Sequence, residues 1–352
     1  MFGTRPEVVK LAPVLWALGG TARTIHTGQH YDPALAAVLL AELGLEPPAV
    51  QLHVGGAPRG AQLGEATMLL DREFETSAPE VVVVQGDTNT TVAAALAANA
   101  RNIPLVHVEA GLRSYDRAMP EEHNRVVTDH LADLCCAPTE TSRAQLAAEG
   151  IEGTRVVVTG NTVVDAAHHM LPASPERAAL LGRFGLAPDD YVLSTFHRPE
   201  NVDDHGVLTT ILGELGRLPH PVVLPLHPRT AARLEQSGAD TGSVRVIEPL
   251  GYREFLGLAR ECAFLVSDSG GVQEEASIVK RPVLVVRAST ERPEVIGTFA
   301  ELVAPGAAIG ARGRAWSDDL AAVHARLAAI PSPYGDGDAG ARTAAAIAGL
   351  LA

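Results

Sequence analysis

Short runs of valine, isoleucine and leucine alternate with helical stretches along almost the whole chain. Because these runs are apolar throughout, each predicts a strand buried on both faces, which is typical of a parallel sheet covered by helices. The predicted strands are Thr24–Thr27, Val81–Gln85, Leu105–Glu109, Val156–Thr159, Val192–Thr195, Val222–Pro225, Val244–Ile247, Phe264–Ser267 and Val283–Val286. We therefore expect an α/β fold.

The alternation falls into two blocks, with a seam near residues 161–175, where a Gly-Asn turn and a helix lead into the sequence PASPE. A chain of 352 residues is long enough for two domains of roughly 150 residues each. We expect two Rossmann-like domains that face each other across a cleft. Their predicted ranges are 1–166 and 167–335, followed by a carboxy-terminal helix over 336–352.

The amino-terminal residues predict a helix that begins almost at once. Pro6 suits a first helical turn, and Val8, Leu11 and Leu15 give that helix an apolar face. A doubly wound fold normally has a central strand before this turn. Because two residues at most remain for it, we expect the sequence shown to begin inside that strand.

Composition excludes several classes of partner. The net charge is −14 and aromatic residues make up 4%, which disfavours nucleic acid and anionic membrane surfaces. No apolar run is long enough to span a bilayer. The three cysteines lack the spacing of a metal site or a disulfide framework, so we expect a reduced, cytoplasmic protein without a metal.

Carboxylates gather in the segment from Val81 to Arg125. Asp87 and Glu109 each stand at the end of a predicted strand, and Glu121 follows in the next loop. Strand ends in an open α/β sheet face the ligand crevice. Grouped carboxylates are costly for stability, so this group predicts proton-transfer chemistry.

A glycine pair marks a candidate phosphate site in the second block. Gly270 and Gly271 follow a predicted strand and open a helix, whose first N–H groups could bind an anion. Glu275, one turn later, could reach sugar hydroxyls. The alternative is an ordinary turn with a serine or aspartate cap.

Basic residues could neutralise such an anion. Arg5 and Lys10 stand in the first helix, His197 and His227 follow two predicted strands, and Arg292 follows another. The two histidines occupy equivalent strand ends, which favours a role in the crevice. For Arg5 and Lys10 the alternative is a solvated helix face, and for Arg292 an ion pair with a neighbouring glutamate.

Eight motifs carry a resemblance to a known family. They are FGTRPE, QGDTNTT, HVEAGLRS, MPEEHNR, TGNTVVDA, HRPEN, SDSGGVQEE and STERPE. In this order they resemble the non-hydrolysing UDP-N-acetylglucosamine 2-epimerase family, from Phe2 to about Arg342. The resemblance implies a fold like that of GT-B glycosyltransferases, a carboxy-terminal helix that crosses back to the first domain, and a homodimer.

The resemblance also implies a reaction. It is the reversible C2 epimerisation of UDP-N-acetylglucosamine to UDP-N-acetylmannosamine, by elimination of UDP to 2-acetamidoglucal and re-addition. A base near C2 and charge neutralisation of the leaving UDP fit this chemistry. No cofactor is expected: the diphosphate has basic partners instead of a metal, and no dinucleotide-binding glycine motif follows an early strand.

Site residues follow from the matching motifs. The catalytic set implied is Asp87, Glu109, Glu121, His197 and Arg5. The implied contacts with the UDP-sugar are Lys10, Arg113, Arg125, His227, Phe255, Ser269, Gly270, Gly271, Glu275 and Arg292. Gln29 and His30 match a regulatory motif of the family, but the residues after them differ, so allosteric activation stays open.

Other functions remain as alternatives. The motifs equally suit a 2-epimerase of a related UDP-2-acetamido sugar, and the expected fold suits a GT-B glycosyltransferase. A hydrolysing epimerase would release free sugar and UDP. A binding protein without activity would bind UDP and catalyse no reaction. Product analysis separates these four.

Overall fold

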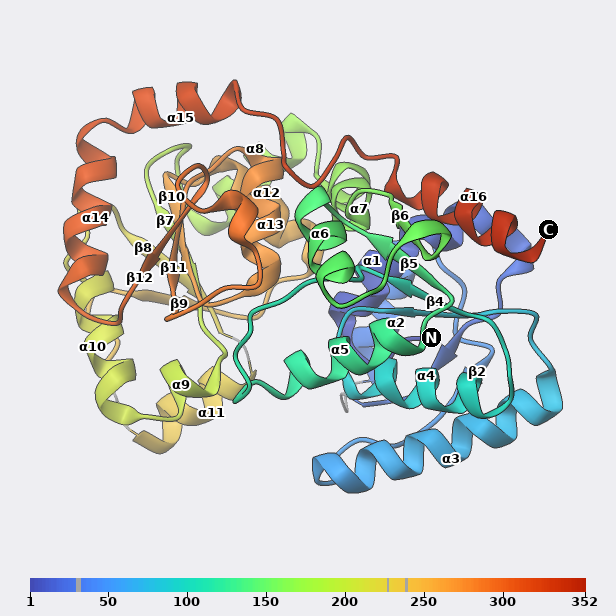
Figure 1. The fold of residues 1–352 in the computed structure, drawn as a ribbon. Helices are drawn as coiled ribbons and strands as arrows, with labels where there is room; N and C mark the ends of the chain where they lie inside the picture. Colours follow the sequence, from blue (N-terminus) through green and yellow to red (C-terminus); the bar gives the residue numbers. More distant parts are fainter. Residues whose placement is uncertain (30–32, 227, 238–239) are drawn as a thin grey trace. The chain divides into compact units, whose positions relative to one another are not determined.

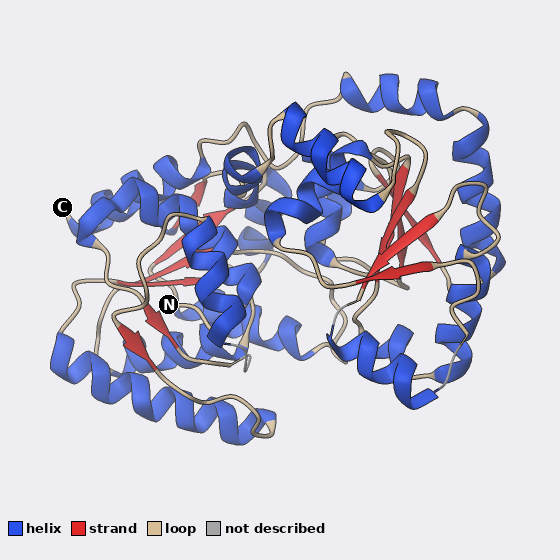
Figure 2. Ribbon diagram, turned by 180° about the vertical axis from the view of Figure 1, so that it is seen from behind, coloured by secondary structure: helices blue, strands red, loops and turns tan. Residues whose placement is uncertain are grey.

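The computed structural model describes residues 1–29, 33–226, 228–237 and 240–352. The chain divides into two compact units. Unit 1 is Met1–His168 with Tyr334–Ala352, and unit 2 is His169–Pro333. Each unit is an α/β structure with parallel strands (Figure 1), and in Figure 2 the strands of each unit lie between helices, as a Rossmann-like fold requires.

Unit 1 contains a parallel sheet in the order β3-β4-β5-β6 and a separate parallel pair, β1-β2, within its described residues. These strands are β1 Ile25–His26, β2 Val50–Gln51, β3 Val82–Gln85, β4 Leu105–Val108, β5 Leu134–Ala137 and β6 Val156–Val158. The sequence prediction missed β2, which has two residues, β5, and the strand Ala300–Val303 of unit 2. The β5 sequence LCCA lacks the β-branched residues that signal a strand.

Met1 and Phe2 lie between the two groups of strands. Phe2 forms a parallel bridge with His26, and the amino group of Met1 donates to the Val83 carbonyl at 3.0 Å. Burial lowers the pKa of this amino group to about 6. The two residues therefore take the central place in the order β2-β1-(Met1–Phe2)-β3-β4, where the expected first strand belongs.

Both faces of the unit 1 sheet are buried. Leu105 and Cys135 point into a core that α3 and α4 share, whereas Val106 and Cys136 point into a second core with α1 and α16. Successive side chains of a strand point to opposite faces, so two covering layers require continuous apolar strands. The helices that begin in unit 1 are α1 Arg5–Leu18, α2 Pro33–Glu42, α3 Arg59–Ser77, α4 Asn89–Ala100, α5 Pro120–Leu131, α6 Glu140–Ala148, α7 Thr162–Met170 and α16 Ala339–Leu351.

The carboxy-terminal helix α16 packs closely on α1. A Cβ atom at Gly340 would lie 2.6 Å from the Pro13 backbone. The Asp165 carboxylate accepts from the N–H groups of Ala339 at 3.2 Å and Gly340 at 2.9 Å, which caps the start of α16. In the described part of the chain, every helix is too short or too polar to cross a membrane.

The described part of unit 2 contains a six-stranded parallel sheet in the order β12-β11-β10-β7-β8-β9. Numbered from β7, this is the doubly wound order 3-2-1-4-5-6, with its switch point between β7 and β10. The strands are β7 Val192–Thr195, β8 Val222–Pro225, β9 Arg245–Ile247, β10 Phe264–Ser267, β11 Val283–Val286 and β12 Ala300–Val303. The helices are α8 Ser174–Phe184, α9 Pro199–Val202, α10 His205–Leu215, α11 Pro228–Ser237, α12 Tyr252–Glu261, α13 Gly270–Val279, α14 Ala307–Asp318 and α15 Leu320–Ala328.

The close packing of α16 predicts a stability effect at one glycine. Gly340→Val should lower the free energy of unfolding by about 1–3 kcal/mol, because the new side chain would overlap the Pro13 backbone. Gly349→Ala in the same helix is the matched control, since its Cβ would meet nothing within 4 Å. Urea denaturation measures both variants, and equal stability of the two would contradict the packing described.

Candidate functional site

Two predicted acid/base carboxylates stand at neighbouring strand ends in unit 1. β3 and β4 are paired in register, with Gln85 opposite Val108. Asp87 therefore follows one strand by two residues and Glu109 directly follows the other. Glu109 has φ +67°, a left-handed conformation that is unfavourable for a residue with a side chain.

Each of these carboxylates has a basic partner. Glu109 is buried, forms an ion pair with Lys10 of α1, and accepts from the Asn161 amide at 3.2 Å. Asp87, which is partly exposed, forms an ion pair with Arg125 of α5. Lys10 and Arg125 thus bind the carboxylates themselves, whatever further contact they make with a ligand.

The first turn of α5 presents two glutamates with different environments. Glu121 is exposed. Glu122 is buried and accepts hydrogen bonds from the backbone N–H groups of Ser114 at 3.0 Å and Tyr115 at 2.9 Å. It also forms an ion pair with Arg125 at 2.5 Å. Burial alone would raise the pKa of Glu122, but these donors hold it below its usual value. Glu122 therefore fixes the preceding loop.

Arg113, an implied contact of the UDP-sugar, lies inside unit 1. Its guanidinium is buried and pairs with Asp129 at 2.7 Å and Glu149 at 2.6 Å. Its ion pairs are thus with other carboxylates than Asp87, Glu109 and Glu121. The implied contact of Arg113 with the UDP-sugar stays a prediction.

A further carboxylate, which the sequence analysis did not single out, joins the start of α1 to the Asp87 loop. Glu7 is buried; one oxygen accepts from Gly3 N at 2.9 Å and Thr4 N at 2.8 Å, and the other accepts from Thr88 Oγ1 at 2.7 Å. Burial raises its pKa. The spacing Thr4-x-x-Glu7, a capping box, was the available signal. Arg5, half-buried, is the first residue of this helix.

Gln29 of the possible regulatory motif also contacts this region. Its side-chain oxygen accepts from Thr90 N at 2.9 Å and Thr90 Oγ1 at 3.0 Å, at the start of α4. His30 and His227, both predicted site residues, lie outside the described residues.

In unit 2, Asp268 and His197 meet at the switch point of the sheet. His197 follows β7 by two residues, and its Nδ1 lies 3.0 Å from Oδ1 of Asp268, which directly follows β10. Asp268 is fully buried and also accepts from Arg198 N at 3.0 Å and Asn201 Nδ2 at 3.1 Å. Burial opposes ionisation, yet these donors hold the pKa of Asp268 below its usual value.

Helix α13 begins with Gly270 and Gly271, directly after Ser269. A Cβ at Gly270 would lie 2.7 Å from Oε1 of Glu291. That glutamate pairs with Arg287 at 3.0 Å and Arg292 at 3.5 Å. A side chain at position 270 would therefore displace this charged carboxylate from the helix start.

Two predicted ligand contacts are buried beside this helix. Arg292 forms an ion pair with the neighbouring Glu291, as the alternative interpretation of the sequence expected. It also donates to Glu274 at 2.5 Å. Glu275 lies in α13 and is also buried, next to the Tyr252 hydroxyl. Burial and the neighbouring Glu275 both raise the pKa of Tyr252.

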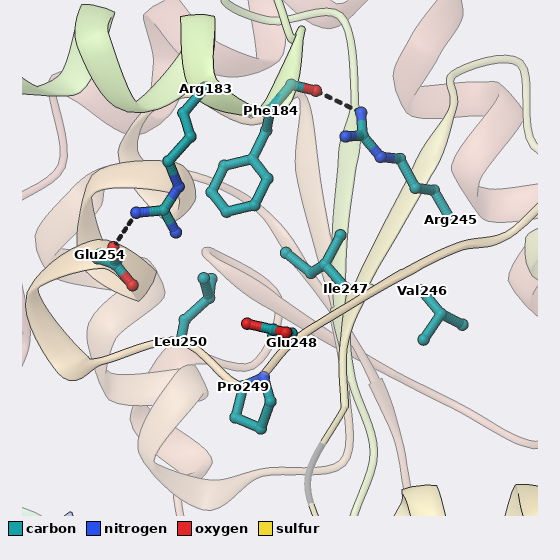
Figure 3. Close-up of a pocket in the computed structure, with 9 residues that line it drawn as sticks. All are labelled: Arg183, Phe184, Arg245, Val246, Ile247, Glu248, Pro249, Leu250 and Glu254. Carbon is teal, nitrogen blue, oxygen red and sulfur yellow. Dashed lines mark hydrogen bonds and ion pairs between the residues drawn. The ribbon is translucent and has the colours of Figure 1, made fainter.

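An open pocket of about 700 Å³ lies beside the edge strand β9 (Figure 3). Across it, Arg183 pairs with Glu254 at 2.6 Å and lies 4.4 Å from the centre of the Phe184 ring. Figure 3 shows Leu250 and Pro249 on its lower side. The half-buried Phe255 follows Glu254 in α12 but does not line the pocket.

Comparison with known proteins decides the family. A sequence model described as UDP-N-acetylglucosamine 2-epimerase matches residues 19–348. The chain belongs to the UDP-N-acetylglucosamine 2-epimerase family. The family resemblance predicted from the motifs is thereby confirmed.

Individual relatives of this family cover most of the chain. A UDP-N-acetylglucosamine 2-epimerase of Methanocaldococcus jannaschii is 40% identical over 86% of this chain and 87% of its own length. A UDP-2,3-diacetamido-2,3-dideoxy-D-glucuronate 2-epimerase of Pseudomonas aeruginosa is 37% identical over 84% of each chain. The crystal structure of the M. jannaschii UDP-GlcNAc 2-epimerase in complex with UDP-GlcNAc and UDP matches 99% of this chain and 98% of its own, with 37% identity and a TM-score of 0.85.

The environment of Asp268 predicts a pH-dependent stability. A carboxylate with a lowered pKa stabilises the fold above its ordinary value of about 4, and this contribution is lost as the pH falls through its folded value. Asp268→Asn should therefore lower the free energy of unfolding by about 2–4 kcal/mol at neutral pH and by less in acid.

Chemical denaturation at a series of pH values measures this difference. Asp318→Asn is the control, because Asp318 is an exposed carboxylate in the same unit. A difference between wild type and Asp268→Asn that stays constant with pH would contradict the ionised state of Asp268.

Proposed function

We propose that the protein catalyses the reversible C2 epimerisation of UDP-N-acetylglucosamine to UDP-N-acetylmannosamine. The observation that carries the proposal is the placement of Asp87 and Glu109 at the ends of two paired strands, in a chain of this family. Glu121, at the start of α5, supplies a third carboxylate. Inversion at C2 needs acid/base groups on both faces of the sugar ring, which a single base would not provide.

The proposed mechanism is an elimination followed by an addition. A carboxylate removes the C2 proton as the C1–O bond breaks, and the bonding electrons leave with the diphosphate oxygen of UDP. The products are UDP and 2-acetamidoglucal, with a C1–C2 double bond. Return of a proton to the opposite face of C2 and re-addition of UDP at C1 complete the inversion.

Unit 1 is assigned the proton transfers. The ion pairs of Glu109 with Lys10 and of Asp87 with Arg125 support this, because they hold each carboxylate in a fixed place. Arg5, at the start of α1, is assigned to the leaving diphosphate.

Unit 2 is assigned the UDP moiety. The start of α13, at Gly270 and Gly271 directly after Ser269, favours a diphosphate, because the first N–H groups of a helix attract anions. His197, oriented by Asp268, can neutralise charge on the leaving oxygen. Glu275 is proposed to bind the ribose, Phe255 to pack near uracil, and Arg292 and His227 to complete the site.

A second substrate is supported by one relative. The P. aeruginosa protein that is 37% identical is named for a diacetamido glucuronate sugar. A 2-epimerase of such a UDP-2-acetamido sugar is therefore the alternative, and parallel assays with both nucleotide sugars separate the two. As family properties, a homodimer and a cytoplasmic location are also proposed, and sedimentation measures the former.

The elimination predicts isotope exchange at carbon. With UDP-N-acetylglucosamine in D₂O, deuterium should enter C2 of both epimers, because the removed proton exchanges with solvent before return. Mass spectrometry of the equilibrated sugars measures it. Epimerisation without deuterium at C2 would contradict the mechanism and leave the activity intact.

Replacement of the carboxylates predicts a loss of rate without a loss of binding. Asp87→Asn, Glu109→Gln and Glu121→Gln should each lower kcat by about 100-fold or more, the lower range of a general acid/base contribution. Affinity for UDP, measured by calorimetry, should change little. Glu140→Gln is the control, since this glutamate is exposed and forms an ion pair with Arg143 of its own helix. Normal turnover in any of the three variants would remove that residue from the acid/base set.

A further inference from the structure

A buried cluster of charged groups lies behind the two strand ends of unit 1. His107 of β4 is fully buried, and its Nε2 lies 2.7 Å from the Gly86 carbonyl oxygen. Its Nδ1 lies 2.6 Å from Oδ1 of Asp129 in α5. One imidazole thus connects β3, β4 and α5.

Asp129 extends the cluster to the loop after β4. Its carboxylate accepts from Gly111 N at 3.2 Å and from Arg113 Nη1 at 2.7 Å. Arg113 in turn donates to both oxygens of Glu149, at 2.7 and 2.6 Å, near the surface. The cluster therefore extends from the buried His107 to the partly exposed Glu149.

Both ring nitrogens of His107 have hydrogen-bond partners. A carbonyl oxygen only accepts, so Nε2 of His107 donates to Gly86. Burial opposes a charge on Asp129, but His107 and Arg113 hold its pKa below the usual value. Nδ1 of His107 shares a hydrogen bond of 2.6 Å with this carboxylate. The ring is therefore fixed at both nitrogens, by a backbone carbonyl on one side and by Asp129 on the other.

The cluster contacts the backbone beside both proposed acid/base residues. Gly86, which has φ +70°, directly precedes Asp87. Gly111 follows Glu109 by two residues, in the turn that begins with the left-handed Glu109. We propose, on the basis of the proposed function, that His107, Asp129 and Arg113 are positioning residues, and that the buried His107 ring orients Asp87 and Glu109 for proton transfer.

Kinetics test the positioning role. His107→Gln keeps a donor for Gly86 and loses the one for Asp129, and should lower kcat by about 100-fold, as expected for a small misplacement of catalytic groups. KM should change by less than about threefold, because none of the three residues touches the substrate in this proposal. His205→Gln, at an exposed histidine that begins α10 in unit 2, should match the wild type. A wild-type kcat in His107→Gln would overturn the proposal.

A second variant tests the role if His107→Gln fails to fold. Asp129→Asn loses the charged oxygen that Arg113 and His107 contact, and should also lower kcat by about 100-fold with KM within about threefold of the wild type. A wild-type kcat in this variant would overturn the inference.

The two proposals fail in different ways. A wild-type protein that is inactive on every UDP-2-acetamido sugar refutes the proposed function. An active wild type whose kcat is unchanged in both His107→Gln and Asp129→Asn refutes the positioning role and leaves the proposed function standing.

Discussion

The register of β3 against β4 is the constraint on which the candidate site of unit 1 depends. With Gln85 opposite Val108, the residues that follow the two strands emerge side by side at one edge of the sheet. Asp87 and Glu109 are 22 positions apart in the sequence. The pairing of the two strands, and not closeness in the sequence, therefore brings them to the same edge. A slip of one residue would turn every side chain of the strand to the opposite face.

In both units, buried carboxylates fix the chain beside the proposed functional groups. In unit 2, Asp268 is inaccessible and accepts from the backbone N–H of His197. In unit 1, Asp129 accepts from the backbone N–H of Gly111 near Glu109, and Glu7 accepts from the Thr88 hydroxyl beside Asp87. Each of these hydrogen bonds stabilises its loop in one conformation.

The sequence predicted the parallel α/β fold and most strands, because continuous apolar runs and strand-end polar residues are local signals. It did not predict which charged side chains pair with one another. Arg113 follows the strand that ends at Glu109, yet it turns to Asp129 and Glu149, which α5 and the loop after α6 bring to it. Lys10 could be a solvated helix residue by sequence, and it is buried against Glu109. Such choices depend on how distant elements pack, which no local pattern encodes. Glu7 did have a local signal, the capping box, but its bond to Thr88 spans 81 positions.

The left-handed backbone at Glu109 has a consequence for how the sequence can evolve. An L-residue in this conformation costs about 1–2 kcal/mol relative to glycine. Glycine or asparagine at position 109 would remove this cost, but would also break the buried ion pair with Lys10, which costs more. The backbone and the ion pair therefore have opposite effects on stability at this position. Glycine becomes favourable at position 109 only after position 10 has changed as well.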